Sequence, residues 1–369
     1  MMFLVYVVFT QTLVGRKLPF ENNHLKDGIK MKKILCVILS TLFIVSMVAC
    51  GSAPAATTTS TASTTTVVPA ASTDTATPAA DKPLIGISVP QAPTGWVAAV
   101  QYYANKQAKE LGLNFKILAA ADPNEQASQI DDLINMKPVA IILMPCNDQV
   151  AVAAQKIKDA GIKLIDFDRT INPTVPDFYL AGDNYGIGVE GAKYIAEKLG
   201  KKGSVIVCGI AAYGDAVNGE RIKGFTDTIA TLAPDIKILG SYDSANGAPE
   251  SGLKTMTDAL QANKVIDGVF SIDDELSVGL YQAITEQKRT DIKVLTGGGG
   301  AQSYFKLMDQ APADVWLASA LYTPSMIVDC VKMADAIIKG TSPAAKTIVP
   351  SKIVDRANVK DYIDAGSPY

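Results

Sequence analysis

The sequence predicts an α/β protein built from two doubly wound parallel-sheet lobes. From residue 84 onward, short apolar runs of strand length alternate with stretches whose apolar residues recur at helical spacing. Several of the runs are apolar throughout, as expected of parallel strands that are covered on both faces. The alternation forms two series that meet near residue 182, and 369 residues are enough for two domains.

The first series contains three strand-helix units and a closing strand. Trp96, Val100, Ala104 and Leu111 recur at helical spacing up to Gly112, and Ile130, Leu133 and Ile134 mark the next helix. We expect strands at 84–89, 115–119, 140–144 and 163–167, and a third helix over 148–160. Residues 179–184 form a short segment that we interpret as the first crossing between the lobes.

The second series repeats the pattern and predicts a second, similar lobe. We expect helices at 186–199, 218–232, 250–262 and 275–286, with strands at 204–208, 237–241, 268–271, 293–296 and 316–321. A helix at 324–339 and a short strand at Ile348 and Val349 follow, and we expect the chain to end in a short polar tail.

The first 83 residues lie outside this pattern. Residues 31–50 have a basic start, an apolar run too short for a comfortable membrane span, and a small residue before Cys50. They resemble a bacterial lipoprotein signal peptide, although Met47 stands where leucine is usual. That resemblance implies cleavage before Cys50, which would carry the lipid; an ordinary secretory signal is the alternative.

The segments on either side of this signal have different origins. Residues 1–30, which contain the one histidine of the chain, His24, precede a complete signal with its own Met31. We interpret them as an upstream extension that translation from Met31 would leave out. Residues 51–83 are rich in Ala, Thr, Ser and Pro and cannot bury a core, so we expect a flexible tether.

Charge and cysteine content exclude several functions. The formal net charge of the whole chain is -3, from 34 basic and 37 acidic residues. Residues 1–50 contain six of the basic and two of the acidic residues. Without them, 28 basic and 35 acidic residues give a net charge of -7. This balance argues against binding to nucleic acid or to anionic lipid. Beyond the signal, Cys146, Cys208 and Cys330 form a poor disulfide framework, and we expect three small buried hydrophobes rather than a redox group.

A polar group at the end of one strand indicates a binding site. Asp166, Asp168 and Arg169 follow the apolar residues of the strand at 163–167. In open parallel sheets ligands bind beyond the carboxyl ends of the strands. An ionised Asp offers only acceptors and an Arg only donors, so together Asp168 and Arg169 suit vicinal hydroxyls. The alternative is that the two charges merely pair with each other.

Six short motifs, in order and spacing, resemble the ribose/galactose-type periplasmic sugar-binding proteins of ABC importers. They lie at residues 87–88, 95–96, 165–169, 181–184, 221–225 and 271–276. The similarity covers residues 84–369 and is most specific at Asp168 and Arg169. It implies the type I periplasmic binding protein fold, in which a three-segment hinge joins the lobes: residues 84–182 with 323–348, and 183–322 with 349–369.

The resemblance also implies ligand contacts from the first lobe. Asp168 and Arg169 would hydrogen-bond sugar hydroxyls, and Trp96 would place its ring on the apolar face of a pyranose. Trp96 fits equally the apolar stripe of its helix, which would make it a core residue. Ser88 and Gln91 are further polar candidates, with plain solvation of a loop as the alternative.

In the second lobe the match is less regular. The sugar-contacting arginine of relatives falls at Gly219 here, so either Asn218 or Arg221 takes its role, or Arg221 is a surface cation on a helix. Asp273 matches a position that is often Asn or Asp, with helix capping as its alternative role. Tyr322 and Asn246 are weaker candidates. Where relatives commonly carry a ligand-binding Asp, this chain has Gly299.

The sequence gives little support for a catalytic function. Without residues 1–50 the chain has no histidine, which excludes Ser-His, Cys-His and His-metal arrangements. Asp166 and Asp168 lie two apart on one strand, so they cannot easily flank a scissile bond from opposite sides. The segment 209–214 has P-loop spacing, but Asp215 replaces the lysine.

The function that we expect is therefore capture of a solute. A monomer without cofactor or metal, lipid-anchored at the outer face of the cytoplasmic membrane, would bind a monosaccharide by closure of its lobes and deliver it to an ABC permease. A receptor that signals to a chemotaxis or two-component sensor is the alternative, since both activities use the same closure. The sequence predicts no nucleic-acid partner.

Overall fold

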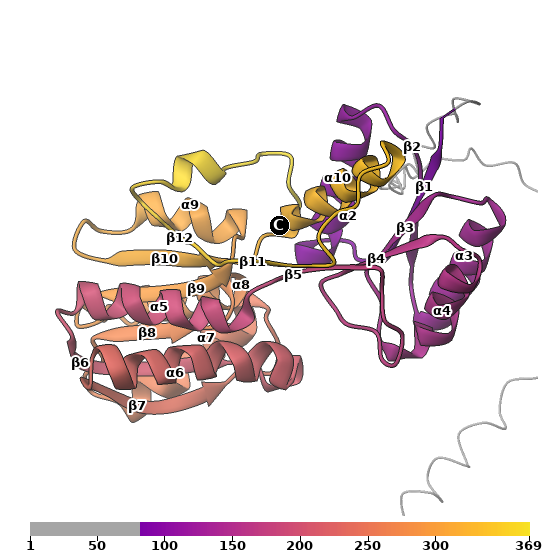
Figure 1. The fold of residues 1–369 in the computed structure, drawn as a ribbon. Helices are drawn as coiled ribbons and strands as arrows, with labels where there is room; N and C mark the ends of the chain where they lie inside the picture. Colours follow the sequence, from indigo (N-terminus) through magenta and orange to yellow (C-terminus); the bar gives the residue numbers. More distant parts are fainter. Residues whose placement is uncertain (1–81) are drawn as a thin grey trace, which may run out of the picture. The chain divides into compact units, whose positions relative to one another are not determined.

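The computed structural model describes residues 82–369 (Figure 1). The expectations for the upstream extension, the signal peptide, Cys50 and nearly all of the tether lie outside the described residues. The described residues form two α/β lobes, each with a six-stranded sheet, so the predicted fold class is confirmed. No helix within residues 82–369 is long and apolar enough to span a membrane.

The sheet of the first lobe is parallel throughout and has the strand order β11-β5-β4-β3-β1-β2. Its strands are β1 (Leu84–Pro90), β2 (Asn114–Ala120), β3 (Ala140–Leu143), β4 (Lys163–Phe167), β5 (Phe178–Gly182) and β11 (Lys346–Val349). Its helices are α2 (Gly95–Glu110), α3 (Pro123–Asn135), α4 (Ala151–Asp159) and α10 (Ile327–Ile338). One apolar cluster lies under α2 and α10 and another under α3 and α4, so both faces of the sheet are covered.

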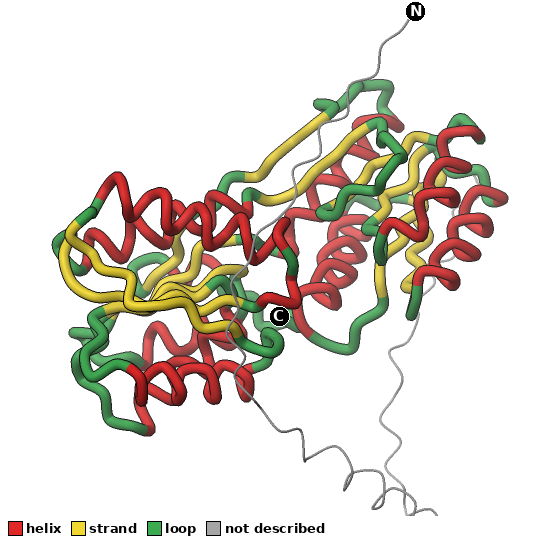
Figure 2. The backbone as a smooth tube through the Cα atoms, turned by 90° about the horizontal axis from the view of Figure 1, so that it is seen from below, coloured by secondary structure: helices red, strands yellow, loops and turns green. Residues whose placement is uncertain are grey.

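The second lobe repeats this plan with the order β12-β10-β9-β8-β6-β7. Its strands are β6 (Lys202–Gly209), β7 (Asp235–Asp243), β8 (Gly268–Ser271), β9 (Val294–Gly299), β10 (Trp316–Leu321) and the antiparallel β12 (Ile353–Asp355). Its helices are α5 (Asn184–Lys198), α6 (Glu220–Leu232), α7 (Pro249–Ala262), α8 (Asp274–Glu286) and α9 (Gln302–Gln310). Figure 2 shows helices against the strands of each lobe.

Local sequence explains where several helices begin. At α3, the Asp122 carboxylate accepts hydrogen bonds from the backbone N–H groups of Asn124 and Glu125, and Pro123 takes the first helical position. Helices α5 and α6 pack very closely because Gly188 leaves room for the backbone of α6. A Cβ atom at Gly188 would lie 2.1 Å from the carbonyl oxygen of Arg221.

Three chain crossings connect the lobes: between β5 and α5, between β10 and the 3₁₀ turn at Pro324–Met326, and between β11 and β12. Hydrogen bonds join them, since Asp183 N–H donates to the Val349 carbonyl (3.1 Å) and Leu321 N–H donates to that of Lys352 (2.9 Å). The crossings therefore lie side by side, and Tyr322 is part of one of them.

Some expected boundaries are wrong. Strand β9 extends through Gly299 rather than ending at Thr296, because pairing with β10 outweighs the low strand propensity of glycine. The helix expected from Asn218 begins with a wide turn at Asp215–Gly219 and becomes α-helical at Glu220. Cys208 and Cys330 are buried as expected, whereas Cys146 is only half-buried in the loop after β3.

The expected short polar tail is also wrong. After β11 the chain adds β12 to the edge of the second sheet and forms a 3₁₀ turn at Val359–Tyr362. It then returns to the first lobe, where Pro368 accepts a hydrogen bond from the N-terminus of α2.

Candidate functional site

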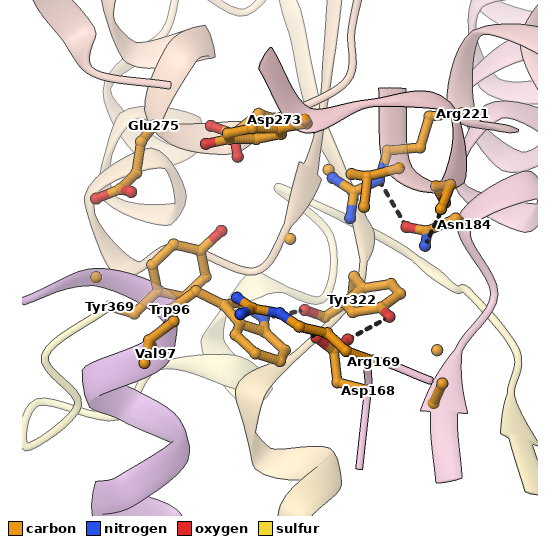
Figure 3. Close-up of a pocket in the computed structure, with 18 of the residues that line it drawn as sticks. Trp96, Val97, Asp168, Arg169, Asn184, Arg221, Asp273, Glu275, Tyr322 and Tyr369 are labelled. Atoms are coloured by element: carbon orange, nitrogen blue, oxygen red, sulfur yellow. Dashed lines mark hydrogen bonds and ion pairs between the residues drawn. The ribbon is translucent and has the colours of Figure 1, made fainter. Parts of the chain in front are cut away.

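A cavity of about 760 Å³ is lined by residues of both lobes and of the crossings. Its size is within the usual range for small-ligand pockets. Figure 3 shows its polar and aromatic side chains converging from several elements. Its polar, charged and aromatic lining includes Trp96, Asp168, Arg169, Tyr179, Asn184, Tyr213, Arg221, Asp273, Glu275, Tyr322 and Tyr369.

The end of β4 brings Asp168 and Arg169 to this cavity, as predicted. Asp168 has a φ of 70°, a left-handed conformation that Asp tolerates better than most residues. Its carboxylate accepts a hydrogen bond from the Tyr322 hydroxyl at 2.6 Å. Burial raises the pKa of Asp168, while the Tyr322 hydroxyl and the guanidiniums of Arg169 and Arg221 act in the opposite direction.

Arg169 pairs only loosely with its neighbour. Its Nε lies 3.7 Å from an Asp168 carboxylate oxygen, and one terminal nitrogen donates to the carbonyls of Pro145 and Cys146. The Arg169 side chain remains 42% exposed and lines the cavity. The two charges are thus not fully satisfied by each other, and both present polar atoms to the cavity.

Trp96, at the start of α2, packs against the core and also lines the cavity. Its ring stacks on Phe167 with centroids 6.0 Å apart and planes at 6°, and it meets Tyr322 at 5.9 Å. Its indole N–H donates to the Tyr322 carbonyl at 2.7 Å. The indole is therefore fixed in place by the core and the crossing while it also lines the cavity.

Arg221 is a cavity residue and not a surface cation. It is 6% exposed; its Nε donates to the Asn184 amide oxygen at 2.9 Å and a terminal nitrogen donates to the Ile272 carbonyl at 2.8 Å. Its guanidinium lies 5.1 Å from the centre of the Tyr322 ring. Asn184 was not among the predicted site residues, although the Asp-Asn pair at 183–184 was one of the motifs of the resemblance.

Asp273 and Glu275, at the start of α8, place two carboxylates on the lining of the cavity. Asp273 caps the helix by accepting from Leu276 N–H at 2.9 Å, which confirms the capping role, and it also lines the cavity. Burial raises its pKa. Burial and the charge of Asp273 raise the pKa of Glu275 to about 7. Glu275 was not predicted from the sequence.

The intervening Asp274 points away from the cavity and has a structural role. Its Oδ2 accepts hydrogen bonds from the N–H groups of Gly300 and Ala301 and from the Ser319 hydroxyl. These contacts fix the turn that follows Gly299, the last residue of β9. Burial raises the pKa of Asp274 to about 7.

Four predicted site residues do not line the cavity. Ser88 is fully buried and accepts a hydrogen bond from the Gln126 amide at 3.2 Å, whereas Gln91 is exposed in its loop. Asn218 accepts from Ile210 N–H at 2.8 Å, and Asn246 accepts from Ala248 N–H at 2.9 Å. Both asparagines use their side chains to stabilise local backbone.

Three tyrosines that the sequence did not indicate as site residues also line the cavity: Tyr179, Tyr213 and Tyr369. Tyr213 follows β6 in a short 3₁₀ turn, and burial raises its pKa to about 12. Tyr369 is 7% exposed at the end of the segment that was expected to be a solvated tail. The cavity thus combines aromatic faces with both signs of charge. Within residues 82–369, His, Cys, Asp and Glu side chains form no group that could hold a metal ion.

Comparisons with known proteins agree with this architecture. The family model described as "Periplasmic binding protein domain" matches residues 85–342. A D-apiose import binding protein of Actinobacillus succinogenes is 28% identical over 288 residues, 76% of this chain and 91% of the relative. A ribose import binding protein of Bacillus subtilis is 25% identical over 272 residues, 73% of this chain and 86% of the relative.

A similar solved structure is that of an ABC transporter periplasmic solute binding protein from Actinobacillus succinogenes with bound D-allose. Its TM-score is 0.67 at 24% identity, with 76% of this chain and all of that chain covered. At this identity the likeness shows a shared fold.

Proposed function

Since this chain belongs to the periplasmic binding protein family, we propose that it is the extracytoplasmic substrate-binding protein of an ABC importer and that it captures a monosaccharide. Its relatives are solute-binding proteins and not enzymes, and those named after a solute include D-apiose and ribose import binding proteins. The observation that carries the proposal is the cavity between the lobes, where donors, acceptors and aromatic faces meet.

The chemistry of the cavity suits a polyhydroxylated ring. Each sugar hydroxyl both donates and accepts, so it is best satisfied by a site that offers carboxylate acceptors and guanidinium donors together. Asp168 and Asp273 supply acceptors, while Arg169 and Arg221 supply donors. Trp96 offers an aromatic face to the apolar C–H face of the ring.

Capture would proceed by closure of the lobes. Asp168, Arg169 and Trp96 belong to the first lobe (residues 84–182 and 323–348), whereas Arg221 and Asp273 belong to the second (residues 183–322 and 349–369). A ligand that contacts both sets binds the closed state more tightly and shifts the population toward it. The closed form would then dock on the permease and release the sugar.

A ligand screen tests this proposal. Thermal shifts of the purified protein are measured with pentoses, hexoses, deoxysugars and small furanosyl compounds, and any hit is followed by calorimetry. Stabilisation by one sugar, with one site per chain, supports capture of that sugar. If no sugar stabilises the protein, the monosaccharide proposal is wrong and the cavity serves another solute.

Membrane attachment is a separate part of the proposal. The lipoprotein-like signal at residues 31–50 would place the lipid on Cys50, and residues 51–83 would tether the lobes to the outer face of the cytoplasmic membrane. Replacement of Cys50 by Ser is expected to move the protein from the membrane fraction to the soluble fraction, whereas Cys146→Ser is expected to leave it with the membranes. Equal membrane association of the Cys50→Ser variant would contradict the lipid anchor.

A further inference from the structure

The segment 363–369 contacts both lobes. On the second lobe, the Gln302 side chain of α9 holds the start of the segment: its amide nitrogen donates to the Tyr362 carbonyl at 3.0 Å and its amide oxygen accepts from Asp364 N–H at 2.9 Å. The ring of Tyr362 also packs against Phe305 of α9. The segment therefore starts from a fixed point on the second lobe.

The same segment reaches α2 of the first lobe. Gly95 N–H, at the start of that helix, donates to the Pro368 carbonyl at 3.3 Å. Thr94 makes no side-chain cap there, so the segment supplies an acceptor to an otherwise uncapped helix start. Further along the helix, Lys106 Nζ lies 3.5 Å from an Asp364 carboxylate oxygen. The segment thus links the lobes in addition to the three chain crossings.

At the end of this segment the Tyr369 side chain enters the cavity. It is 93% buried, since 7% of its surface is exposed, and it lines the cavity beside Asp273 and Glu275. Figure 3 shows its ring between these two carboxylates and Trp96. Among the described residues, its hydroxyl makes no hydrogen bond. Because Tyr369 lines the cavity, this hydroxyl is free to bond a ligand group there.

The Tyr369 hydroxyl occupies the place of a side chain at position 299. A Cβ atom built on Gly299 would lie 2.1 Å from this hydroxyl oxygen, far inside van der Waals contact. Gly299 also has a φ of 140°, which a residue with a side chain rarely adopts. Gly299 and Tyr369 are therefore complementary: the last residue of β9 lacks a side chain where the phenol of a distant residue lies.

We propose that Tyr369 is a ligand-contacting residue whose hydroxyl bonds a hydroxyl group of the bound sugar, and that segment 363–369 is a strap that carries it across both lobes. This inference rests on the proposed function and assigns one contact of the same site. A phenol at this place sets specificity differently from a carboxylate, because it both donates and accepts.

The surroundings of Tyr369 keep its hydroxyl protonated and able to donate. Burial and the nearby carboxylates of Asp273, Asp274 and Glu275 raise its pKa well above the ordinary value, so the phenol keeps its proton at neutral pH. Asp273 and Glu275 supply acceptors on the same side of the cavity. A sugar hydroxyl placed between them can accept from Tyr369 while it donates to a carboxylate.

The first test removes the hydroxyl alone. Calorimetry with D-apiose, D-ribose, D-xylose and D-allose is carried out on the wild-type protein and on Tyr369→Phe. For the sugar that binds best, Tyr369→Phe is expected to weaken binding about three- to tenfold, as for one lost hydrogen bond. Among deoxy analogues of that sugar, one should bind both proteins equally, because it lacks the hydroxyl that Tyr369 contacts.

Tyr362→Phe is the matched control, because it removes the same group from a residue of the preceding turn that does not line the cavity. It is expected to bind like the wild type. Equal binding by wild type and Tyr369→Phe would overturn the inference while leaving the proposed function intact. If the wild type binds none of the four sugars, the proposed function fails for this panel and the inference falls with it.

The second test needs no ligand. Gly299→Ala is expected to lower the Tm in the wild-type background, because its methyl group collides with the Tyr369 hydroxyl and its backbone is strained. In the Tyr369→Ala background only the strain remains, so the same change is expected to lower the Tm by much less. Equal losses in both backgrounds would mean that Tyr369 does not occupy this place in solution, and would overturn the inference.

Discussion

Replacement of Asp168 by Asn separates the charge of this residue from its shape. The backbone at Asp168 has a φ of 70°, and Asn tolerates this conformation about as well as Asp. The variant should therefore fold with little change in Tm. What it loses is an ionised acceptor that faces the Tyr322 hydroxyl and stands near two guanidiniums.

The loss of affinity can be estimated from this geometry. A hydrogen bond to a charged group contributes about 1.5–3 kcal/mol, which corresponds to roughly a 10- to 150-fold change in Kd. We expect Asp168→Asn to weaken binding of the captured sugar within this range. Titration calorimetry at pH 7 measures the change directly, on proteins whose Tm values have been compared first.

Asp131→Asn provides the control for this experiment. It makes the same chemical change in the same lobe, but at an exposed ion pair with Lys156, which contributes little to stability. Its Kd should equal that of the wild type. A Kd for Asp168→Asn within twofold of the wild type would refute the reasoning, since it would show that the carboxylate does not contact the ligand.

Three further predictions concern stability and spectroscopy. Both carboxyl oxygens of Asp166 are buried without a hydrogen-bond partner, and burial followed by the charge of Asp168 raises its pKa to about 8. The folded protein keeps a proton on Asp166 that the unfolded chain loses, so the wild type should lose stability as the pH rises from about 4 through 8. The Tm of Asp166→Asn should fall less over that range. Parallel curves of Tm against pH for the two proteins would contradict this. Gly188→Ala should lower the free energy of unfolding by about 3 kcal/mol or more, because its Cβ atom would lie 2.1 Å from a backbone carbonyl oxygen. Gly240→Ala, whose Cβ atom would lie 3.6 Å from the nearest side-chain atom, should lower it by about 1 kcal/mol or less. Similar losses for the two variants in urea titrations would contradict this reasoning. Of the two tryptophans, Trp96 lines the cavity and Trp316 does not. The change in tryptophan fluorescence on ligand binding should therefore persist in Trp316→Phe and disappear in Trp96→Phe. The reverse result would place the ligand elsewhere.

The fold was predictable because its signals are local. Apolar runs of strand length and helical spacing recur along the chain, and parallel strands place their carboxyl ends at one edge of a sheet. That rule was sufficient to find Asp168 and Arg169 from the sequence of β4 alone. The motif resemblance added Trp96, Arg221 and Asp273, which all line the cavity.

Which other residues line the cavity depends on contacts between distant parts of the chain. Ser88 is withdrawn from the cavity because Gln126, 38 residues away, reaches its hydroxyl. Asn218 lies only three residues before Arg221, but its side chain turns back to Ile210. Tyr369 enters the cavity through a segment whose composition indicated a solvated tail. No local pattern specifies any of these three arrangements.

The contacts of Tyr322 join the two lobes, so under the proposed function this residue would link ligand binding to movement of the lobes. This residue lies in one of the three crossings, where its hydroxyl donates to Asp168 and its carbonyl accepts from the Trp96 indole, both in the first lobe. Its ring faces the Arg221 guanidinium of the second lobe. Rotation of the lobes about the crossings must change at least one of these contacts, because they are attached to different lobes. If the proposed sugar bridges Asp168 and Arg221, it would hold both ends of this chain of contacts, and filling the site would also fix the angle between the lobes. Hinge residues are often but not necessarily small, so a large side chain such as that of Tyr322 is compatible with a place in a crossing.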